Sequence, residues 1–82
     1  MNVEILYFAG AREITGKGSE LADLPDQVTT IGEAFAWMTE RYPELLPYGE
    51  SLRIARNEVF ADFNDPIETG DVLAVIPPVA GG

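Results

Sequence analysis

The order of apolar and polar positions predicts a β-strand near each end of the chain. Residues 2–9 contain β-branched and aromatic residues without a breaker, and their apolar side chains fall on both faces of an extended chain. Residues 72–76 are apolar throughout. A strand that is apolar on both faces is typical of the centre of a sheet. We therefore expect these two strands to lie side by side in the middle of one sheet.

The same pattern predicts one main helix in the middle of the chain. Apolar residues recur there at helical spacing and form a single stripe: Ile31, Ala34, Phe35, Met38 and Tyr42. Thr30 and Glu33 have the spacing of a capping box, with Thr30 as the N-cap residue. Pro43 cannot continue a helix in its interior, so the helix is predicted to end near Tyr42. Trp37 lies off the stripe, either at the edge of the core or exposed to solvent.

The remaining segments are shorter. Further strands are predicted at residues 19–24, 52–56 and 59–61. Loops or turns are predicted at residues 10–18, 45–49, 57–58 and 66–71. The strand at 52–56 alternates apolar and basic residues, so we expect it to be half exposed, with Arg53 and Arg56 solvated. With the helix on one face of the sheet, this order predicts an α+β domain of two layers.

Length and charge narrow the possible function classes. A chain of 82 residues is predicted to form one domain, which we place at residues 1–76. Five Lys and Arg residues against 14 Asp and Glu residues give a formal net charge of −9. This charge argues against nucleic acid and against an anionic membrane surface as partners, because both need clustered cations. A basic protein surface is the natural complement, and such an association should weaken with salt.

Two residue types are missing from the chain, which has no cysteine and no histidine. Their absence excludes a side-chain thiolate or persulfide, the most common acid–base group at neutral pH and the usual transition-metal ligands. Four carboxylates near the end lack the spacing of a calcium loop, and we interpret them as solvated turn residues: Asp62, Asp65, Glu68 and Asp71. We therefore expect no metal site, no bound cofactor and no catalysis by this chain alone. The first residues lack the pattern of a signal peptide, and a cytoplasmic location is expected.

Residues 77–82 are predicted to form a flexible tail that reads PPVAGG. Its members are Pro77, Pro78, Val79, Ala80, Gly81 and Gly82. The prolines favour an extended exit from the last strand, and the two glycines allow entry into a narrow channel that a Cβ would block. The α-carboxylate of Gly82 is ionised at neutral pH and reacts only after activation, for example as an acyl-adenylate. We expect the tail to thread into a partner, with Gly82 as the reacting residue.

Three short motifs occur in order along the chain. They are Phe8-Ala9-x-x-Arg12-Glu13, Pro66-Ile67-x-x-Gly70-Asp71 and Pro77-Pro78-Val79-x-Gly81-Gly82. Each motif is weak alone, but the three in this order, with Gly-Gly at the end, form a specific signal. Over its whole length the chain resembles the small sulfur-carrier subunit of molybdopterin synthase. The resemblance implies the ubiquitin-like β-grasp fold, a mixed sheet with one main helix packed on one face.

The resemblance also implies a function. An ATP-dependent, ubiquitin-activating-like adenylyltransferase would adenylate the Gly82 carboxylate, which would then become a thiocarboxylate with sulfur from a persulfide. The charged carrier would bind the large subunit of molybdopterin synthase, in a heterotetramer of two large and two small subunits. There it would donate sulfur to a pterin precursor during molybdenum cofactor biosynthesis. A chain without cysteine can carry sulfur covalently only at a carboxylate, which is consistent with this scheme.

Four residues are candidates for binding a partner. Phe8, Phe60 and Ile76 are expected to form an apolar docking patch near the tail, since a single helix can cover only one face of a small sheet. The alternative is that all three belong to the core. Arg12, in the first motif, is the fourth candidate, and the alternative for it is a local ion pair with Glu13.

Three other functions remain open at this stage. The sulfur carrier for the thiazole of thiamine shares the fold and the tail chemistry. A ubiquitin-like protein modifier would instead end in an isopeptide bond between Gly82 and a lysine. The third alternative is an interaction module whose tail has no chemical role.

Overall fold

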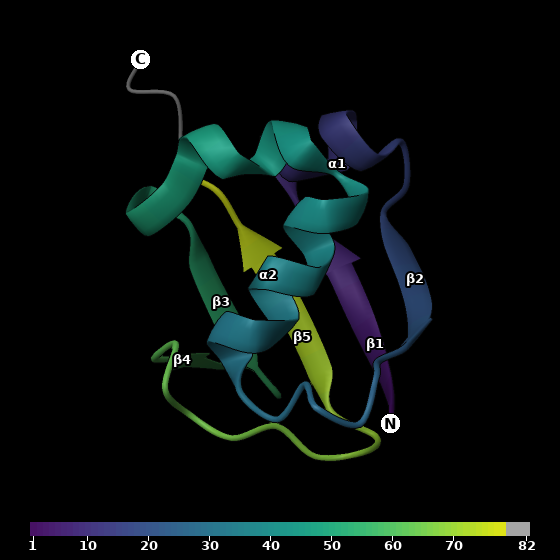
Figure 1. Cartoon of the computed structure of the whole chain (residues 1–82). Helices are drawn as coiled ribbons and strands as arrows, with labels where there is room; N and C mark the ends of the chain where they lie inside the picture. Colours follow the sequence, from purple (N-terminus) through teal and green to yellow (C-terminus); the bar gives the residue numbers. More distant parts are fainter. Residues whose placement is uncertain (79–82) are drawn as a thin grey trace.

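One five-stranded sheet packs against one main helix (Figure 1). The computed structural model describes residues 1–78 of the chain. Its elements are, in order, β1 (Asn2–Tyr7), α1 (Ala9–Thr15), β2 (Ser19–Asp23), α2 (Ile31–Arg41), the 3₁₀ segment η1 (Pro43–Ser51), β3 (Arg53–Arg56), β4 (Val59–Ala61) and β5 (Val72–Ile76).

The five strands form one mixed sheet in the order β2-β1-β5-β3-β4. Strands β1 and β5 are parallel neighbours at its centre, with Leu6 opposite Ala74, and the other pairs are antiparallel. The prediction of two adjacent central strands is therefore confirmed. Strands β2 and β4 are the edges, and β4 has only three residues.

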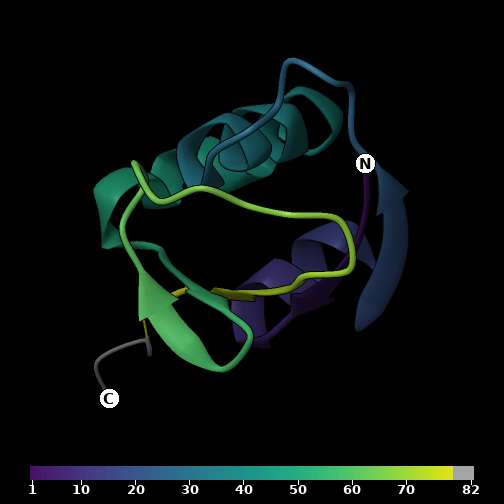
Figure 2. The same ribbon diagram turned by 90° about the horizontal axis from the view of Figure 1, so that it is seen from below.

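Helix α2 covers one face of this sheet, as the view from below shows (Figure 2). The predicted stripe forms its inner side: Ile31, Ala34, Phe35 and Met38 are buried, and Tyr42 is half-buried at the C-cap. They pack on inward-facing strand residues, with Ile5, Leu73 and Val75 fully buried in the sheet. Trp37 is half-buried and packs against the edge of this core. The predicted α+β architecture of two layers is confirmed.

The N-terminus of α2 is capped much as the sequence predicts. The backbone N–H of Glu33 donates to the Thr30 hydroxyl at 3.2 Å. The Glu33 carboxylate accepts from the backbone N–H of Thr29 at 3.1 Å, one residue earlier than in a standard capping box. The bond from the Thr29 N–H is the main reason that the pKa of Glu33 lies below its usual value.

Two segments predicted as loops are helical instead. Residues 10–18 were expected to form a loop because of their glycines, yet α1 begins at Ala9 and ends at Thr15. Its C-cap residue is Gly16, whose φ of 76° is left-handed. Strand β1 accordingly ends at Tyr7 rather than at residue 9. Residues 45–49 lie inside η1, where Leu45 is fully buried. Both helices are short and bury few side chains, so their apolar periodicity is too brief to detect.

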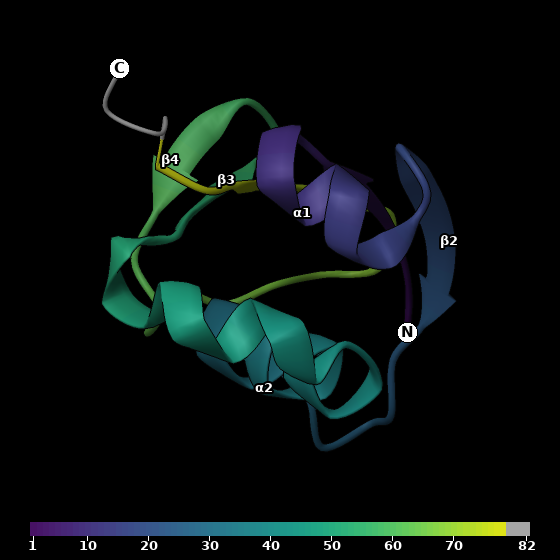
Figure 3. The same cartoon turned by 90° about the horizontal axis from the view of Figure 1, so that it is seen from above.

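Both short helices lie at one end of the sheet, where the central strands β1 and β5 end (Figures 1 and 3). The chain leaves the sheet at the same end, since Pro77 and Pro78 follow directly after β5. Pro77 is buried and Pro78 is exposed. Val79, Ala80, Gly81 and Gly82 lie outside the described residues. Of the helices in the described part, none is long and apolar enough to cross a membrane.

Candidate functional site: the open face of the sheet

The face of the sheet opposite α2 carries apolar side chains that no helix of residues 1–78 covers. Side chains alternate along each strand, so the neighbours of the buried core residues point to this face. Leu6 on β1 lies opposite Ala74 on β5, which lies opposite Ala55 on β3, and Ala55 lies opposite Phe60 on β4. This row of small and large apolar residues crosses four of the five strands.

A hollow of about 610 Å³ lies on this face. Its lining consists of Leu6, Phe8, Ala55, Asn57, Glu58, Phe60, Val72, Ala74 and Ile76. The three residues predicted to form a docking patch are all among them. Phe8 is 47% exposed and Phe60 is 62% exposed, so the alternative that these two belong to the core is wrong. Ile76 is half-buried and is the last residue of β5.

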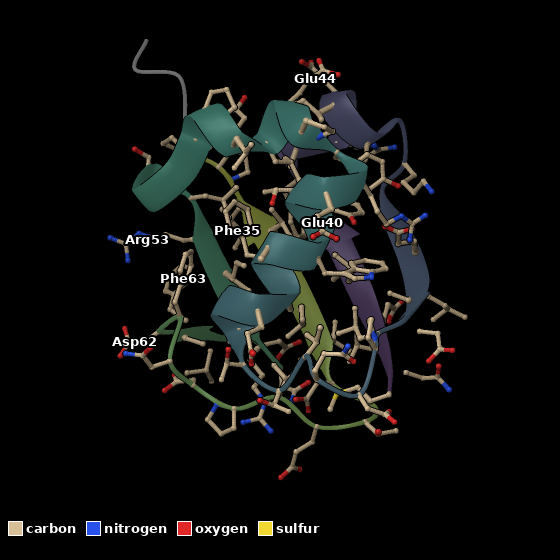
Figure 4. All side chains as sticks on the ribbon, viewed as in Figure 1. Phe35, Glu40, Glu44, Arg53, Asp62 and Phe63 are labelled. Atoms are coloured by element: carbon tan, nitrogen blue, oxygen red, sulfur yellow. The ribbon has the colours of Figure 1, made fainter. Side chains whose placement is uncertain are left out.

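The hairpin of β3 and β4 positions Phe60 at one side of the hollow. Asn57 and Glu58 form its two-residue turn, and both have positive φ angles, 51° and 73°. Two such residues are typical of the type I′ turn that joins twisted antiparallel strands. The Arg53 guanidinium lies 5.6 Å from the centre of the Phe60 ring, a distance that allows a cation–π contact. Figure 4 shows Arg53 extending outward at this side of the molecule.

Arg12 lies apart from the hollow. It is exposed on α1, and its guanidinium carbon would be 3.6 Å from a Cβ placed on Gly18. Within residues 1–78 no salt bridge joins it to Glu13, so the alternative of a local ion pair is not supported. The structure thus brings Phe8, Phe60 and Ile76 together and leaves Arg12 at a different place on the surface.

Two residues predicted to be solvated, Arg56 and Asp71, form an ion pair instead. Only 6% of Asp71 is exposed, and its carboxylate accepts from the Arg56 Nε at 2.6 Å. The Asn57 amide and the backbone N–H of Glu68 also donate to this carboxylate, at 3.0 and 2.7 Å. Burial raises the pKa of Asp71, but these hydrogen bonds together hold it below its usual value. The alternation at residues 52–56 gave no sign that Arg56 has a buried partner.

A second cluster around a nearly buried carboxylate lies at the opposite edge of the sheet. The Tyr7 hydroxyl donates to Glu20 on β2 at 2.5 Å, and the Lys17 amine donates to the same carboxylate at 3.4 Å. Burial and the neighbouring Glu20 carboxylate raise the pKa of Tyr7 far above its usual value. This cluster was not predicted, because Tyr7 lies 13 positions from Glu20 in the chain and the two meet only through the pairing of β1 with β2.

Further acidic residues lie in a turn or extend into solvent. The Asp65 carboxylate accepts from the backbone N–H of Asp62 at 2.9 Å, as expected in a turn. Glu40 and Glu44 extend from α2 and η1 into solvent (Figure 4). In residues 1–78 no group of three His, Cys, Asp or Glu side chains is arranged to hold a metal ion.

Comparison with known proteins identifies the family. The model of the ThiS family matches residues 5–82. The chain belongs to the ThiS family. Because this match covers nearly the whole sequence, it includes both the open sheet face and the tail.

Curated relatives of this ThiS-family chain carry the name that the motifs suggest. The molybdopterin synthase sulfur carrier subunit of Aedes aegypti is 38% identical, with 100% of this chain and 90% of the relative covered. The human protein of the same name is 32% identical, with 98% and 93% covered. The resemblance predicted from the motifs is thus confirmed.

Solved structures support the fold. SAMP1 from Haloferax volcanii is 27% identical and covers all of both chains, with a TM-score of 0.85. One chain in a complex of subunits 1 and 2 of the molybdopterin-converting factor from Helicobacter pylori is 26% identical over the full length of both chains, with a TM-score of 0.67. This ThiS-family chain has the ubiquitin-like β-grasp fold, as the resemblance implied.

Proposed function

We propose that this chain is a sulfur carrier for molybdopterin synthesis, with the Gly82 carboxylate as the carrying group. The observation that carries the proposal is the position of the hollow relative to the tail. Ile76 lines the hollow, ends β5 and is followed at once by the residues PPVAGG. A partner that covers the open sheet face would therefore receive the tail at the same place. Full-length similarity to named sulfur carrier subunits supports this assignment.

The chemistry runs through the terminal carboxylate in two stages. A carboxylate oxygen of Gly82 attacks the α-phosphate of ATP, which releases pyrophosphate and leaves an acyl-adenylate. A persulfide sulfur then attacks the carbonyl carbon and displaces AMP, and a thiol reduces the resulting acyl disulfide to the thiocarboxylate. Without cysteine or histidine, the chain supplies no nucleophile or neutral-pH base of its own. The ATP site and the acid–base groups therefore belong to the adenylyltransferase, and this chain binds no cofactor.

The partner that fits the open face is the large subunit of molybdopterin synthase. Exposed Phe8 and Phe60 provide apolar anchors, and aromatic anchors in a central hollow often dominate the affinity of an interface. The net charge of −9 favours a basic partner surface and predicts slower association at high salt. The solved complex from Helicobacter pylori, which contains subunits 1 and 2, supports a pair of this kind. Two large and two small subunits would form the complete enzyme.

Intact mass spectrometry tests the proposal. The purified chain is incubated with ATP, the adenylyltransferase and a persulfide donor, and its mass is compared with a sample lacking ATP. We expect a gain equal to the exchange of one oxygen for sulfur, mapped to Gly82 by fragmentation. An unchanged mass, under conditions that charge a known carrier, would contradict the proposal. Adding a pterin precursor and the large subunit should then consume the thiocarboxylate, whereas a thiazole carrier would retain it.

A second candidate function is protein modification. The structure named small archaeal modifier protein 1 from Haloferax volcanii matches this chain with a TM-score of 0.82 and 26% identity, over 95% of this chain and 98% of that one. A modifier would form an isopeptide bond between Gly82 and a lysine of another protein. Gly-Gly remnants on lysines of other proteins, found after proteolysis of cells that express this chain, would support modification. Their absence, together with a thiocarboxylate at Gly82, would leave sulfur transfer as the function.

A further inference from the structure

The Asp71 carboxylate connects three parts of the chain beside the open sheet face. It accepts from Arg56 at the end of β3, from Asn57 in the β3–β4 turn and from the backbone of Glu68 before β5. The backbone carbonyl of Asp71 also accepts from the N–H of Glu4 on β1, at 3.0 Å. One nearly buried residue thus holds β1, β5 and the β3–β4 hairpin at a single point.

Asn57 transmits this contact to the hairpin through two further hydrogen bonds. Its side-chain oxygen accepts from the backbone N–H of Val72 at 2.9 Å, and its own N–H donates to the Val72 carbonyl at 2.8 Å. Strand β4 is a three-residue edge strand that pairs with β3 alone in residues 1–78. These hydrogen bonds therefore attach the turn end of the β3–β4 hairpin to the first residue of β5.

The fastened turn forms part of the hollow wall. Asn57, Phe60 and Val72 all line the hollow. We propose that Asp71 is a positioning residue for the docking surface, acting through Arg56 and Asn57 to hold the hairpin, and with it Phe60, against β5. The inference rests on the proposed function, in which this surface binds the large subunit. The affinity for the large subunit then depends on Asp71, a residue that is itself nearly buried.

Asp71→Asn changes this contact with little change in shape. Each carboxylate oxygen of Asp71 accepts hydrogen bonds from two donors. Whichever oxygen the amide nitrogen of asparagine replaces, this nitrogen is itself a donor and cannot accept those bonds. Asn57→Gly is the second variant. It removes both side-chain hydrogen bonds of Asn57 but suits the positive φ angle of that residue, so the turn itself is retained.

The cluster at the other edge of the sheet provides a matched control. The Glu20 side chain is 10% exposed, against 8% for Asp71, and it likewise accepts hydrogen bonds and lies near cations. Strands β1 and β5 separate β2, which carries Glu20, from β3 and β4. Glu20→Gln should therefore weaken the fold in a similar way without reaching the hollow.

Two measurements test the inference, both on the full chain. In the free protein, Asp71→Asn and Asn57→Gly should speed exchange of the backbone amides at positions 57 and 72 by about tenfold or more, while Glu20→Gln leaves these amides protected. In titrations with the large subunit, the first two variants should bind about tenfold more weakly. Glu20→Gln should bind within about twofold of the wild type. All variants are compared at a temperature where each is fully folded.

The outcomes separate the inference from the function on which it rests. A wild-type chain that does not bind the large subunit would contradict the proposed docking function, and the inference with it. Wild-type binding with unchanged affinity in Asp71→Asn and Asn57→Gly would overturn the inference alone. Equal losses of affinity in these variants and in Glu20→Gln would also overturn it, because they would show that general stability, and not the hairpin, sets the affinity.

Discussion

The hydroxyl of Tyr48 lies over Gly10 in the space that a Cβ on Gly10 would occupy. Gly10 is in the first turn of α1 and Tyr48 is in η1, so this contact joins the two short helices at the end of the sheet where β5 ends. Gly10 has no positive φ angle, and its small size is required by the close approach of Tyr48 rather than by backbone conformation.

Gly10→Ala should therefore have opposite effects in two backgrounds. In the wild type, the new methyl group overlaps the Tyr48 hydroxyl and should lower the free energy of unfolding by about 1 kcal/mol. In Tyr48→Phe the nearest remaining atom, the ring carbon Cζ, is 3.4 Å away, an ordinary contact distance. There the better helix propensity of alanine should raise the free energy of unfolding by up to about 1 kcal/mol. Urea denaturation of the four proteins measures both effects, and an equal effect in both backgrounds would contradict the contact.

The contact between Gly10 and Tyr48 also illustrates what the sequence can predict. Elements with a long apolar pattern were predicted correctly, including the stripe from Ile31 to Tyr42 and the adjacent central strands. Helices α1 and η1 were missed, because their few buried side chains depend on contacts with each other and with the sheet. The apolar periodicity within one segment does not predict such contacts between segments.

The candidate site likewise has features that the sequence predicts and others that it does not. Phe8, Phe60 and Ile76 were predicted to share a surface, because a single helix leaves one sheet face uncovered, and the structure places them in one hollow. The ion pair between Arg56 and Asp71 was missed, since the residues are 15 positions apart and each is next to ordinary turn or strand residues. Charged pairs of this kind follow from strand order and register, which become known only with the fold.

Asp71 should make the protein sensitive to acid. The pKa of Asp71 in the folded state is below the ordinary value of 3.8. The carboxylate therefore stabilises the fold in full at pH values above the pKa that Asp71 has in the unfolded chain. This stabilisation is lost as the pH falls through the lower folded pKa, where the proton breaks the contacts to Arg56 and Asn57. The free energy of unfolding should thus fall steeply below about pH 4, and less steeply in Asp71→Asn.

Urea denaturation at a series of pH values measures this difference. The variant should be less stable than the wild type at pH 7, and the two curves should converge toward low pH. Tyr7→Phe is a useful control, because the raised pKa of Tyr7 affects stability only at alkaline pH. Above about pH 10 the Tyr7 hydroxyl ionises in the unfolded chain but not in the folded one, and the stabilisation is lost. Parallel acid curves for Asp71→Asn and the wild type would show that the Asp71 carboxylate does not contribute.

Phe60→Glu should separate docking from folding. Phe60 is 62% exposed on an edge strand, so its replacement should change the free energy of unfolding by no more than about 0.5 kcal/mol. A charge in the apolar hollow should weaken binding of the large subunit by about 2 kcal/mol or more. Calorimetric titration and thermal unfolding measure the two quantities.

Leu46→Glu is the matched control for this prediction. Leu46 is 59% exposed, but it lies on η1 and does not line the hollow. It should leave both affinity and stability nearly unchanged. Equal losses of affinity in the two variants would show that the added negative charge, and not the hollow, is responsible.

The tail should tolerate only small side chains at Gly81. If the tail threads into a narrow channel of the large subunit, Gly81→Ala should slow sulfur transfer moderately, and Gly81→Trp should abolish it, because each added atom meets the channel wall. Position 81 follows the domain predicted at residues 1–76 in the sequence, so we expect thermal unfolding of both variants to match that of the wild type. The assay follows loss of the thiocarboxylate by mass spectrometry after the large subunit and pterin precursor are added to chains that already carry sulfur. Starting from charged chains keeps any defect in adenylation out of the measurement. Full transfer by Gly81→Trp would show that the tail does not enter a narrow channel.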